Sequence, residues 1–436
     1  MMMDLLSITA VTPFLAFSLF AGLVCMALAA SALWILPTKK AALKESPSPP
    51  STERSKSKDT KNRETFACPF SAETSFVVET AEHLEDTPLD CYGDWEDHLA
   101  ARWLAAGLSG QETPGMLRMG LKRLRNSKHF LVETASQIKE ELLMKKRALD
   151  DPARHDIVYV QEESSIPAQS ELLELFMAYL PKRYPDIYSY NVQEKSVTVH
   201  PLDTTFRLDD WKHAPLELCE RIVQEDLILM RPGKSASDSG KLAPEGYYMA
   251  AAAVVFSFDE LPEKLGQPAE FLHAPVPGYE RHLRKGLNMF FNKLKVEQPM
   301  WRNNWGIAPS GTLDKPIYGS TSALEHRNMG NVTRADVRAK FLKVEYETIR
   351  RLPRSGYLLF TVRSFANPIT CLEEVPPTAA ACLAASIRGM SPAMQAYKGI
   401  ENEATSDAVL SYLDAISGKV GALSDKAKSP EEKKEE

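Results

Sequence analysis

The hydrophobic and polar pattern predicts both helices and strands along the chain. Apolar residues recur every three to four positions in five segments, as in helices that bury one face. Proline marks two of the expected boundaries, because Pro215 would open one helix and Pro181 would stop another. The expected helices cover residues 170–180, 215–230, 280–294, 377–390 and 406–416.

Three other segments have the pattern of strands. Residues 247–258 (YYMAAAAVVFSF) form a continuous apolar run between Gly246 and Asp259, which suits a buried strand. Residues 341–349 and 357–365 flank a Pro-Arg-Ser-Gly turn and predict an antiparallel hairpin. Helices packed on an antiparallel sheet define the α+β class, so we expect that fold.

The N-terminus predicts a membrane anchor. No charged residue lies between Leu5 and Pro37, and residues 14–36 are long and apolar enough to span a bilayer. A cleaved signal peptide is the alternative, with Ala-Ser-Ala at residues 30–32 as a cleavage site. The length of the stretch and the lack of a preceding Lys or Arg favour a single-pass anchor. The lysines and arginines after it would keep the main domain in the cytosol.

Composition divides the chain into four parts. Residues 1–38 are the anchor, and residues 39–65 are a Ser-, Pro- and Lys-rich tether that is either a solvated spacer or a contact with anionic lipid. Residues 66–420 have enough apolar residues for a folded domain, and residues 421–436 are a charged, disordered tail. Residues 234–246 read as a surface loop.

Charge and cysteine content exclude several function classes. The 436 residues carry a net charge of -6, which offers no field for nucleic acid, so we expect no nucleic-acid partner. The six cysteines are scattered and include no Cys-x-x-Cys pair, which argues against zinc ribbons and iron–sulfur clusters. The chain has no motif for flavin or NAD(P)H, and no nucleophile elbow or zinc-peptidase motif.

One histidine stands out by its local sequence. His273 precedes Pro275 and Pro277, which fix the backbone and favour extended geometry just before the helix expected at 280–294. A rigidly held histidine suits a metal ligand or an acid/base group. The alternative is a histidine that only hydrogen-bonds a backbone carbonyl beside a proline turn.

Two polar groups interrupt apolar segments. Gln224, Glu225 and Asp226 fall inside the helix expected at 215–230, where they would pair with arginines or line a cavity if buried. If they lie on the solvated face of that helix, they have no special role. Residues 300–307 (MWRNNWGI) mix Trp, Arg and Asn, which suits either a pocket wall or a strand with one aromatic face in the core.

Eight short motifs in order resemble those of one family over residues 90–399. They are residues 119–124 (MGLKRL), 180–185 (LPKRYP), 223–227 (VQEDL), 264–266 (KLG), 273–277 (HAPVP), 302–305 (RNNW), 351–353 (RLP) with 360–363 (FTVR), and 397–399 (YKG). Together they resemble the haem-dependent oxidative N-demethylase-like family, found in fungi and bacteria. The resemblance implies a haem-binding α+β core similar to a PAS domain.

The resemblance also implies an activity and its partners. It implies that haem b, held by the protein, oxidises a small alkylamine with dioxygen, with electrons from a separate reductase. His273 would be the ligand of the haem iron. Arg302 and Trp305 would contact the cofactor, and Asn304 would polarise bound oxygen. By the same resemblance, Glu225 and Asp226 would be catalytic groups near the pocket, together with Asn304.

One segment departs from the family pattern. Residues 345–347 read Glu-Tyr-Glu, where the family usually carries Glu-Arg-Gln or His-Arg-Gln. Three hypotheses therefore stay open. The first is a membrane-tethered haem monooxygenase that demethylates a small amine or related molecule. The second is a non-catalytic PAS-like protein that binds or senses haem or a small ligand, and the third is a membrane-associated scaffold without the cofactor.

Overall fold

A computed structural model describes residues 99–108, 117–125, 127–233, 246–256, 261–313 and 337–427. It confirms the α+β class. Seven antiparallel strands form the main sheet in the order β1-β8-β9-β10-β6-β7-β2, and three more form a small sheet in the order β3-β4-β5. The main strands are β1 (Lys122–Arg123), β2 (Tyr159–Gln161), β6 (Asp226–Pro232), β7 (Tyr247–Ala253), β8 (Met300–Ala308), β9 (Phe341–Arg351) and β10 (Leu358–Pro368). The small sheet comprises β3 (Tyr188–Asn191), β4 (Ser196–Val199) and β5 (Thr204–Arg207).

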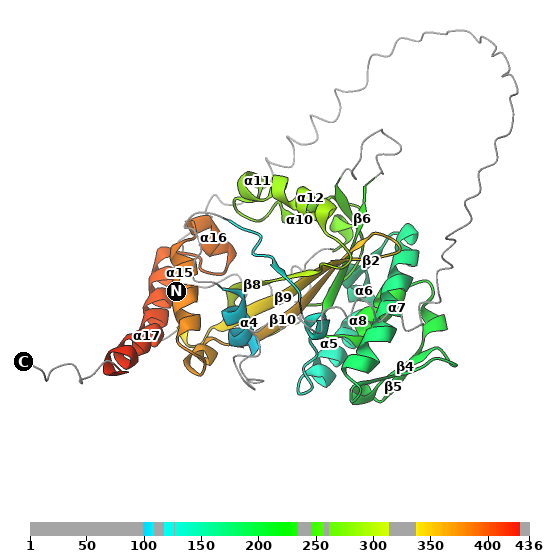
Figure 1. Ribbon diagram of the computed structural model, residues 1–436, viewed down its shortest axis with the longest axis horizontal. Coiled ribbons are helices and arrows are strands. Elements are labelled where there is room, and N and C mark those ends of the chain that lie inside the picture. Colours follow the sequence, from blue (N-terminus) through cyan, green and yellow to red (C-terminus); the bar gives the residue numbers. More distant parts are fainter. Residues whose placement is uncertain are drawn as a thin grey trace, which may run out of the picture. The chain divides into compact units, whose positions relative to one another are not determined.

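Helices cover both faces of the main sheet. Figure 1 shows α10, α11 and α12 on one side of the strands, with α4, α5 and α8 on the other. The helices are α4 (Leu99–Gly107), α5 (Ile138–Asp150), α6 (Pro152–Val158), α7 (Ile166–Arg183), α8 (Pro215–Ile222), α9 (Leu261–Lys264), α10 (Ala269–His273), α11 (Tyr279–His282), α12 (Arg284–Lys293), α15 (Thr378–Arg388), α16 (Pro392–Tyr397) and α17 (Glu403–Ala427).

The side chains of each central strand alternate between two hydrophobic clusters. On β6, Leu227 and Leu229 join the large cluster under α4, α5, α7 and α8. Ile228 and Met230 join the smaller cluster, which includes Leu287 of α12. Because both faces are buried, β6 and β7 read as continuous apolar runs. The strand expected at residues 247–258 is confirmed in β7, and the predicted hairpin is confirmed in β9 and β10, which pair from Phe341↔Pro368 to Arg351↔Leu358.

The helix expected at residues 215–230 is wrong in its second half. Helix α8 ends at Ile222, and β6 begins at Asp226. The apolar residues after Asp226 are buried on both faces of a strand, and a short apolar run does not distinguish this from a buried helix. Pro181 also fails to stop α7, which continues to Arg183. Proline removes only one hydrogen bond, and here it lies in the last turn.

Two further expectations near His273 need correction. The backbone at His273 is not extended, because this residue ends α10. The two prolines lie just after the helix, and even Ala274, directly before Pro275, has the helical values φ -53° and ψ -37°, so the extended preference before proline gives way to the helix here. The helix expected at residues 280–294 is divided at Leu283 into α11 and α12. The helix expected at residues 377–390 is confirmed as α15, and α17 extends well beyond the expected 406–416.

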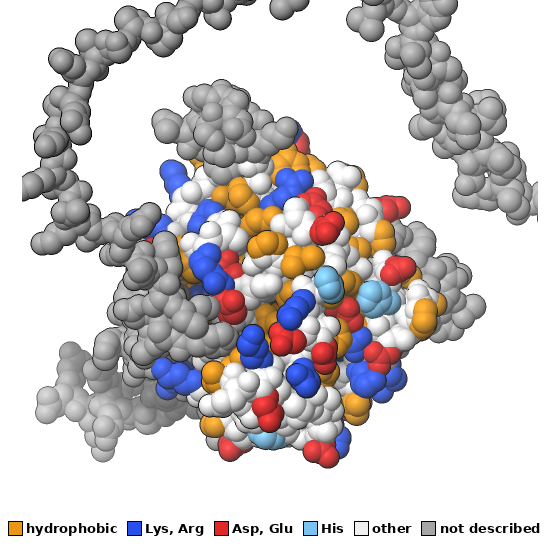
Figure 2. All heavy atoms as spheres, turned by 90° about the vertical axis from the view of Figure 1, so that its right-hand side faces the viewer, with side chains coloured by type: hydrophobic (Ala, Val, Ile, Leu, Met, Phe, Trp, Pro, Cys, Tyr) orange, Lys and Arg blue, Asp and Glu red, His pale blue; other side chains and the backbone are white. Residues whose placement is uncertain are grey.

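Several sequence predictions fall on residues that the structure does not describe. These are the anchor at 1–38, the tether at 39–65, the loop at 234–245 and the tail after Ala427; α17 itself enters the segment predicted as tail. Within the described ranges, no helix combines the length and apolar character needed to cross a bilayer. On the face drawn in Figure 2, acidic and basic side chains are interspersed with hydrophobic ones.

Candidate functional site

Two cross-strand pairs place four polar side chains on one face of the sheet. Arg302 of β8 lies opposite Glu347 of β9, and Asn304 lies opposite Glu345. Arg302 Nε is 2.7 Å from Glu347 Oε2, and Asn304 Nδ2 donates to Glu345 Oε2 at 2.7 Å. Residues directly opposite in an antiparallel pair point to the same face, so the two pairs form a continuous polar surface.

A crossing segment adds Lys398 to this surface. The residues after α16 run along β8, where Ile307 N donates to Lys398 O at 2.8 Å. Gly399 permits this close approach, because it has a φ of 82° and a Cβ there would lie 2.0 Å from Ile307 O. The Lys398 Nζ donates to Asn304 Oδ1. We call Arg302, Asn304, Glu345, Glu347 and Lys398 the polar floor.

Burial moves the pKa values of two floor residues closer to 7. Burial raises the pKa of Glu347 to about 7, although the neighbouring Arg302 opposes this. Burial and the positive charge of Arg302 lower the pKa of Lys398 to about 8. Groups with such values exchange protons near physiological pH, which is typical of sites that do chemistry.

His273 lies within electrostatic range of the polar floor. Its Nδ1 is 2.7 Å from Ala269 O, and its ring stacks on Tyr279 with 5.3 Å between centroids. The carbonyl fixes the tautomer with the proton on Nδ1, which leaves the Nε2 lone pair available. Burial, together with the charge of Arg302, lowers the pKa of His273, so the ring is neutral at pH 7.

Glu225 and Asp226 belong to a separate buried network. Glu225 Oε1 accepts a hydrogen bond from Val132 N at 2.6 Å, and Asp226 Oδ1 accepts one from Val255 N at 2.9 Å. Both side chains are almost completely buried, so the solvated alternative is wrong. Asp226 is linked to Arg302 by three successive cross-strand pairs, Asp226 to Val362, Val362 to Glu347 and Glu347 to Arg302, so the two residues lie three strands apart. At a strand spacing of about 4.8 Å, their Cα atoms are about 14 Å apart.

Buried cations balance part of this network. Lys145 Nζ is 2.7 Å from Glu220 Oε1, and Arg363 Nη1 is 2.8 Å from Glu141 Oε2. Burial raises the pKa of Glu220, Glu225 and Glu133. The acids outnumber the cations, so some of them hold a proton in the folded state. The network joins α5, α8 and β6, and its observed contacts are structural.

Comparison with known families identifies the chain. The family model described as "Haem-dependent oxidative N-demethylase, alpha subunit-like" matches residues 120–409, which is well over half of the sequence. The chain belongs to this family. The resemblance seen in the sequence motifs is therefore confirmed. A search of curated proteins finds no match.

The polar floor and His273 lie inside the matched residues of this N-demethylase-like chain, and they fit a haem. Among the described residues, no group of three or more His, Cys, Asp or Glu side chains could hold a metal ion. A haem needs only one or two protein ligands, and His273 offers a neutral nitrogen. Arg302 and Lys398 supply cations of the kind that bind carboxylates.

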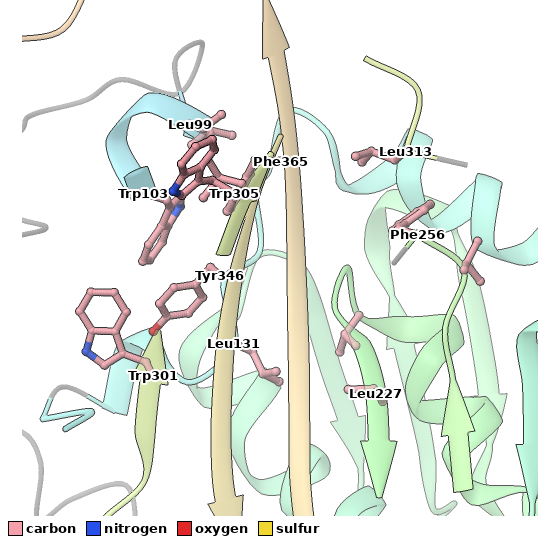
Figure 3. Packing of buried hydrophobic residues seen from close by; sticks show 14 of the residues in the cluster. Leu99, Trp103, Leu131, Leu227, Phe256, Trp301, Trp305, Leu313, Tyr346 and Phe365 are labelled. Atoms are coloured by element: carbon pink, nitrogen blue, oxygen red, sulfur yellow. The ribbon is translucent and has the colours of Figure 1, made fainter. Parts of the chain in front are cut away.

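Trp305 lies on the other face of β8 in this N-demethylase-like chain. Trp301 and Trp305 are buried in the large hydrophobic cluster, with Trp103 and Tyr346 close by (Figure 3). The rings of Trp103 and Tyr346 have centroids 4.0 Å apart. Residues 300–307 therefore form a strand with its aromatic face in the core, which was one of the two structures expected from their sequence. The polar side chains at positions 302 and 304 occupy the face of the polar floor.

Sequence reasoning noticed three floor residues without assigning them a role. Glu345 and Glu347 appeared only as a departure from the family pattern, and Lys398 only as part of a motif. The alternation of residues 345–347 carried a usable signal, because residues i and i+2 of a strand share a face. The same alternation explains why the aromatic Tyr346 is accommodated, since its side chain enters the core and not the polar floor.

Proposed function

We propose that this protein is a haem-dependent monooxygenase that oxidatively demethylates a small amine or a related small organic molecule. The observation that carries the proposal is His273, a neutral imidazole with a fixed tautomer beside the polar floor, in a chain of this family. Haem b would supply dioxygen activation and one-electron chemistry when bound. The protein residues would bind, orient and exchange protons.

His273 would hold the iron through Nε2, with Ala269 O and Tyr279 fixing the orientation of the ring. Arg302 would bind a propionate, and Asn304 would donate to or polarise a bound ligand. Trp305 lies on the opposite face of β8 and would support the cofactor indirectly, by fixing the β8 backbone and the side chain of Lys398. The Lys398 Nζ lies 5.6 Å from the centre of the Trp305 ring. Glu225 and Asp226 would hold β6 in place from the separate buried network; Asp226 lies three strands from Arg302, so these acids would support the site without contacting a molecule on the polar floor.

The polar floor also suits an amine substrate. Glu345 and Glu347 are acceptors for an alkylammonium group, and Glu347 would take up or release its proton near pH 7. Oxidation at a carbon beside nitrogen gives a carbinolamine, which breaks down to formaldehyde and the demethylated amine. Excluding water from this surface would favour that reaction over side reactions.

The supply of electrons and the location of the protein are further parts of the proposal. The absence of flavin, NAD(P)H and iron–sulfur motifs from the sequence supports a separate reductase partner. The apolar segment at residues 14–36 supports a single-pass membrane anchor with the domain at residues 66–420 in the cytosol. Five strands lie side by side in the order β7-β6-β10-β9-β8, and the helices α9 to α12 connect β7 to β8. This arrangement supports a PAS-like core.

A sensing function is the second candidate. Its specific support is the Glu-Tyr-Glu sequence at residues 345–347, where Glu347, which departs from the family pattern, pairs with Arg302 on the polar floor. The test is turnover of small N-methylated amines by the haem-loaded protein with an artificial reductant, followed by formaldehyde release. Formaldehyde formation that requires dioxygen and His273 supports the monooxygenase. A haem-loaded protein that forms no formaldehyde from any such amine supports the sensor.

A further inference from the structure

Lys398 is half-buried and is held differently from the fully buried Lys145. Lys145 forms an ion pair with Glu220 at 2.7 Å, in a fully buried site. Lys398 Nζ donates instead to the uncharged Oδ1 of Asn304. Within the described ranges, no carboxylate lies within 4.0 Å of it. A carboxylate would stabilise the ammonium form, whereas an amide oxygen does so much less.

The surroundings of Lys398 also favour a neutral amine. Its Nζ lies 5.6 Å from the Trp305 ring and 5.7 Å from the Tyr397 ring, so aromatic surface replaces part of the water around the half-buried amine. The guanidinium of Arg302 repels a second positive charge, whereas Glu345 and Glu347 attract it; desolvation and Arg302 outweigh the two carboxylates, and the pKa of Lys398 is lowered to about 8. Desolvation and a neighbouring cation are the two conditions that turn a lysine into a nucleophile for carbonyl groups.

The backbone holds this amine at a fixed place in the site. The Ile307–Lys398 hydrogen bond and the close approach of Gly399 anchor the residue against β8. Glu345 and Glu347 lie on the same polar floor, and Glu347, whose pKa burial raises to about 7, can exchange a proton with a bound molecule. An amine, a cation and acids are therefore assembled around one surface.

We propose that Lys398 is a carbonyl-reactive lysine that captures small aldehydes as a Schiff base. The identification of formaldehyde as its aldehyde rests on the proposed function. The neutral Nζ adds to the carbonyl carbon, and one proton moves from nitrogen to oxygen to give a carbinolamine. The hydroxyl group then takes a proton from Glu347 or solvent and leaves as water, which gives the iminium. Addition of water reverses both steps and frees the aldehyde. The site would thus retain the aldehyde and keep it from other nucleophiles.

The state of the amine predicts its reactivity. At pH 7 about one Lys398 side chain in ten is neutral, against about one in three thousand ordinary lysines. A more acidic amine is a weaker nucleophile, so the gain in rate is smaller than this ratio. We expect capture at Lys398 to be at least about tenfold faster than at exposed lysines.

The test uses formaldehyde itself and needs neither haem, amine substrate nor reductant. The purified full chain is treated at pH 7 with a low concentration of isotope-labelled formaldehyde and cyanoborohydride, which converts the Schiff base to methyl-lysine. Peptide mapping by mass spectrometry then follows Lys398, with exposed Lys146 and buried, ion-paired Lys145 as internal references. The rates are repeated across pH, in the wild type and in Arg302→Met.

The expected result is labelling of Lys398 at least about tenfold faster than Lys146, half-maximal near pH 8, with the midpoint moved upward in Arg302→Met. Labelling of Lys398 no faster than Lys146 would overturn the inference, as would an unchanged midpoint in a folded Arg302→Met protein. Because the assay contains no haem, this result stands or fails independently of the demethylation assay.

Discussion

Replacing Glu347 by Gln should change how the stability of the domain depends on pH. Burial raises the pKa of Glu347 to about 7, against 4.5 for an ordinary glutamate. The folded state therefore binds more protons than the unfolded state between these values, and the free energy of unfolding falls as pH rises through this window. A tenfold change in proton affinity is worth about 1.4 kcal/mol, so the ionised carboxylate costs the fold about 3 kcal/mol above pH 7.

Glutamine is uncharged at every pH, so Glu347→Gln should abolish this dependence. Below pH 4.5 the wild type and the variant should be about equally stable, because both side chains are neutral. Above pH 7 the variant should be more stable, by about 3 kcal/mol. Urea unfolding of the haem-free protein, followed by tryptophan fluorescence from pH 4 to 8, measures the difference. Titrating groups that do not interact with Glu347 cancel in this comparison; Lys398, whose pKa the charge of Glu347 raises, titrates near the upper end of the range.

The control is Glu280→Gln, which removes an exposed glutamate that pairs with Arg284. It should leave the pH dependence of the wild type in place. Parallel stability curves for the wild type and Glu347→Gln across the whole range would refute the reasoning. They would mean that the ion pair with Arg302 offsets the cost of burying the carboxylate.

Three further substitutions test the packing that positions the site. Lys145→Met leaves Glu220 buried without its cation and should cost about 3–5 kcal/mol in urea unfolding, whereas Lys146→Met, at an exposed ion pair, should cost less than about 1 kcal/mol. Gly356→Ala should lower the free energy of unfolding by about 1–2 kcal/mol, because Gly356 has a positive φ. Gly399→Ala should lower it by clearly more, because Gly399 has a positive φ and also lies against the backbone of Ile307. Equal losses in the two variants would contradict this. Trp103→Ala should lower the free energy of unfolding by about 3–5 kcal/mol, and a loss below 1 kcal/mol would contradict its place in the core.

The sequence predicted the elements whose pattern is local. The hairpin of β9 and β10 and the strand β7 could be read from turn residues and apolar runs. The change from helix to strand after Ile222 could not, because DLILM suits a buried segment of either kind. That choice depends on pairing with β7, the next strand along the chain, and with β10, which is distant in the sequence.

The candidate site could be predicted only in part for the same reason. His273, Arg302 and Asn304 were selected from local sequence and resemblance, and the structure places them around one surface. Lys398 joins them through a crossing of β8 by residues almost one hundred positions later, which no local pattern encodes. Glu225 and Asp226 were expected to pair with arginines or line a cavity if they were buried. They are buried, but their carboxylates accept hydrogen bonds from backbone amides, and the cation beside Asp226 is Lys145, whose Nζ lies 3.8 Å from its Oδ1.

The central claim is that His273 binds a haem iron, and an absorption spectrum tests it most directly. The purified protein is supplied with haem and its spectrum is recorded before and after reduction and addition of carbon monoxide. We predict a Soret band that shifts on both treatments, is lost in His273→Ala and is retained in His155→Ala, a histidine near Glu217 outside the site. A folded protein without a Soret band, or with the same band in His273→Ala, would contradict the account.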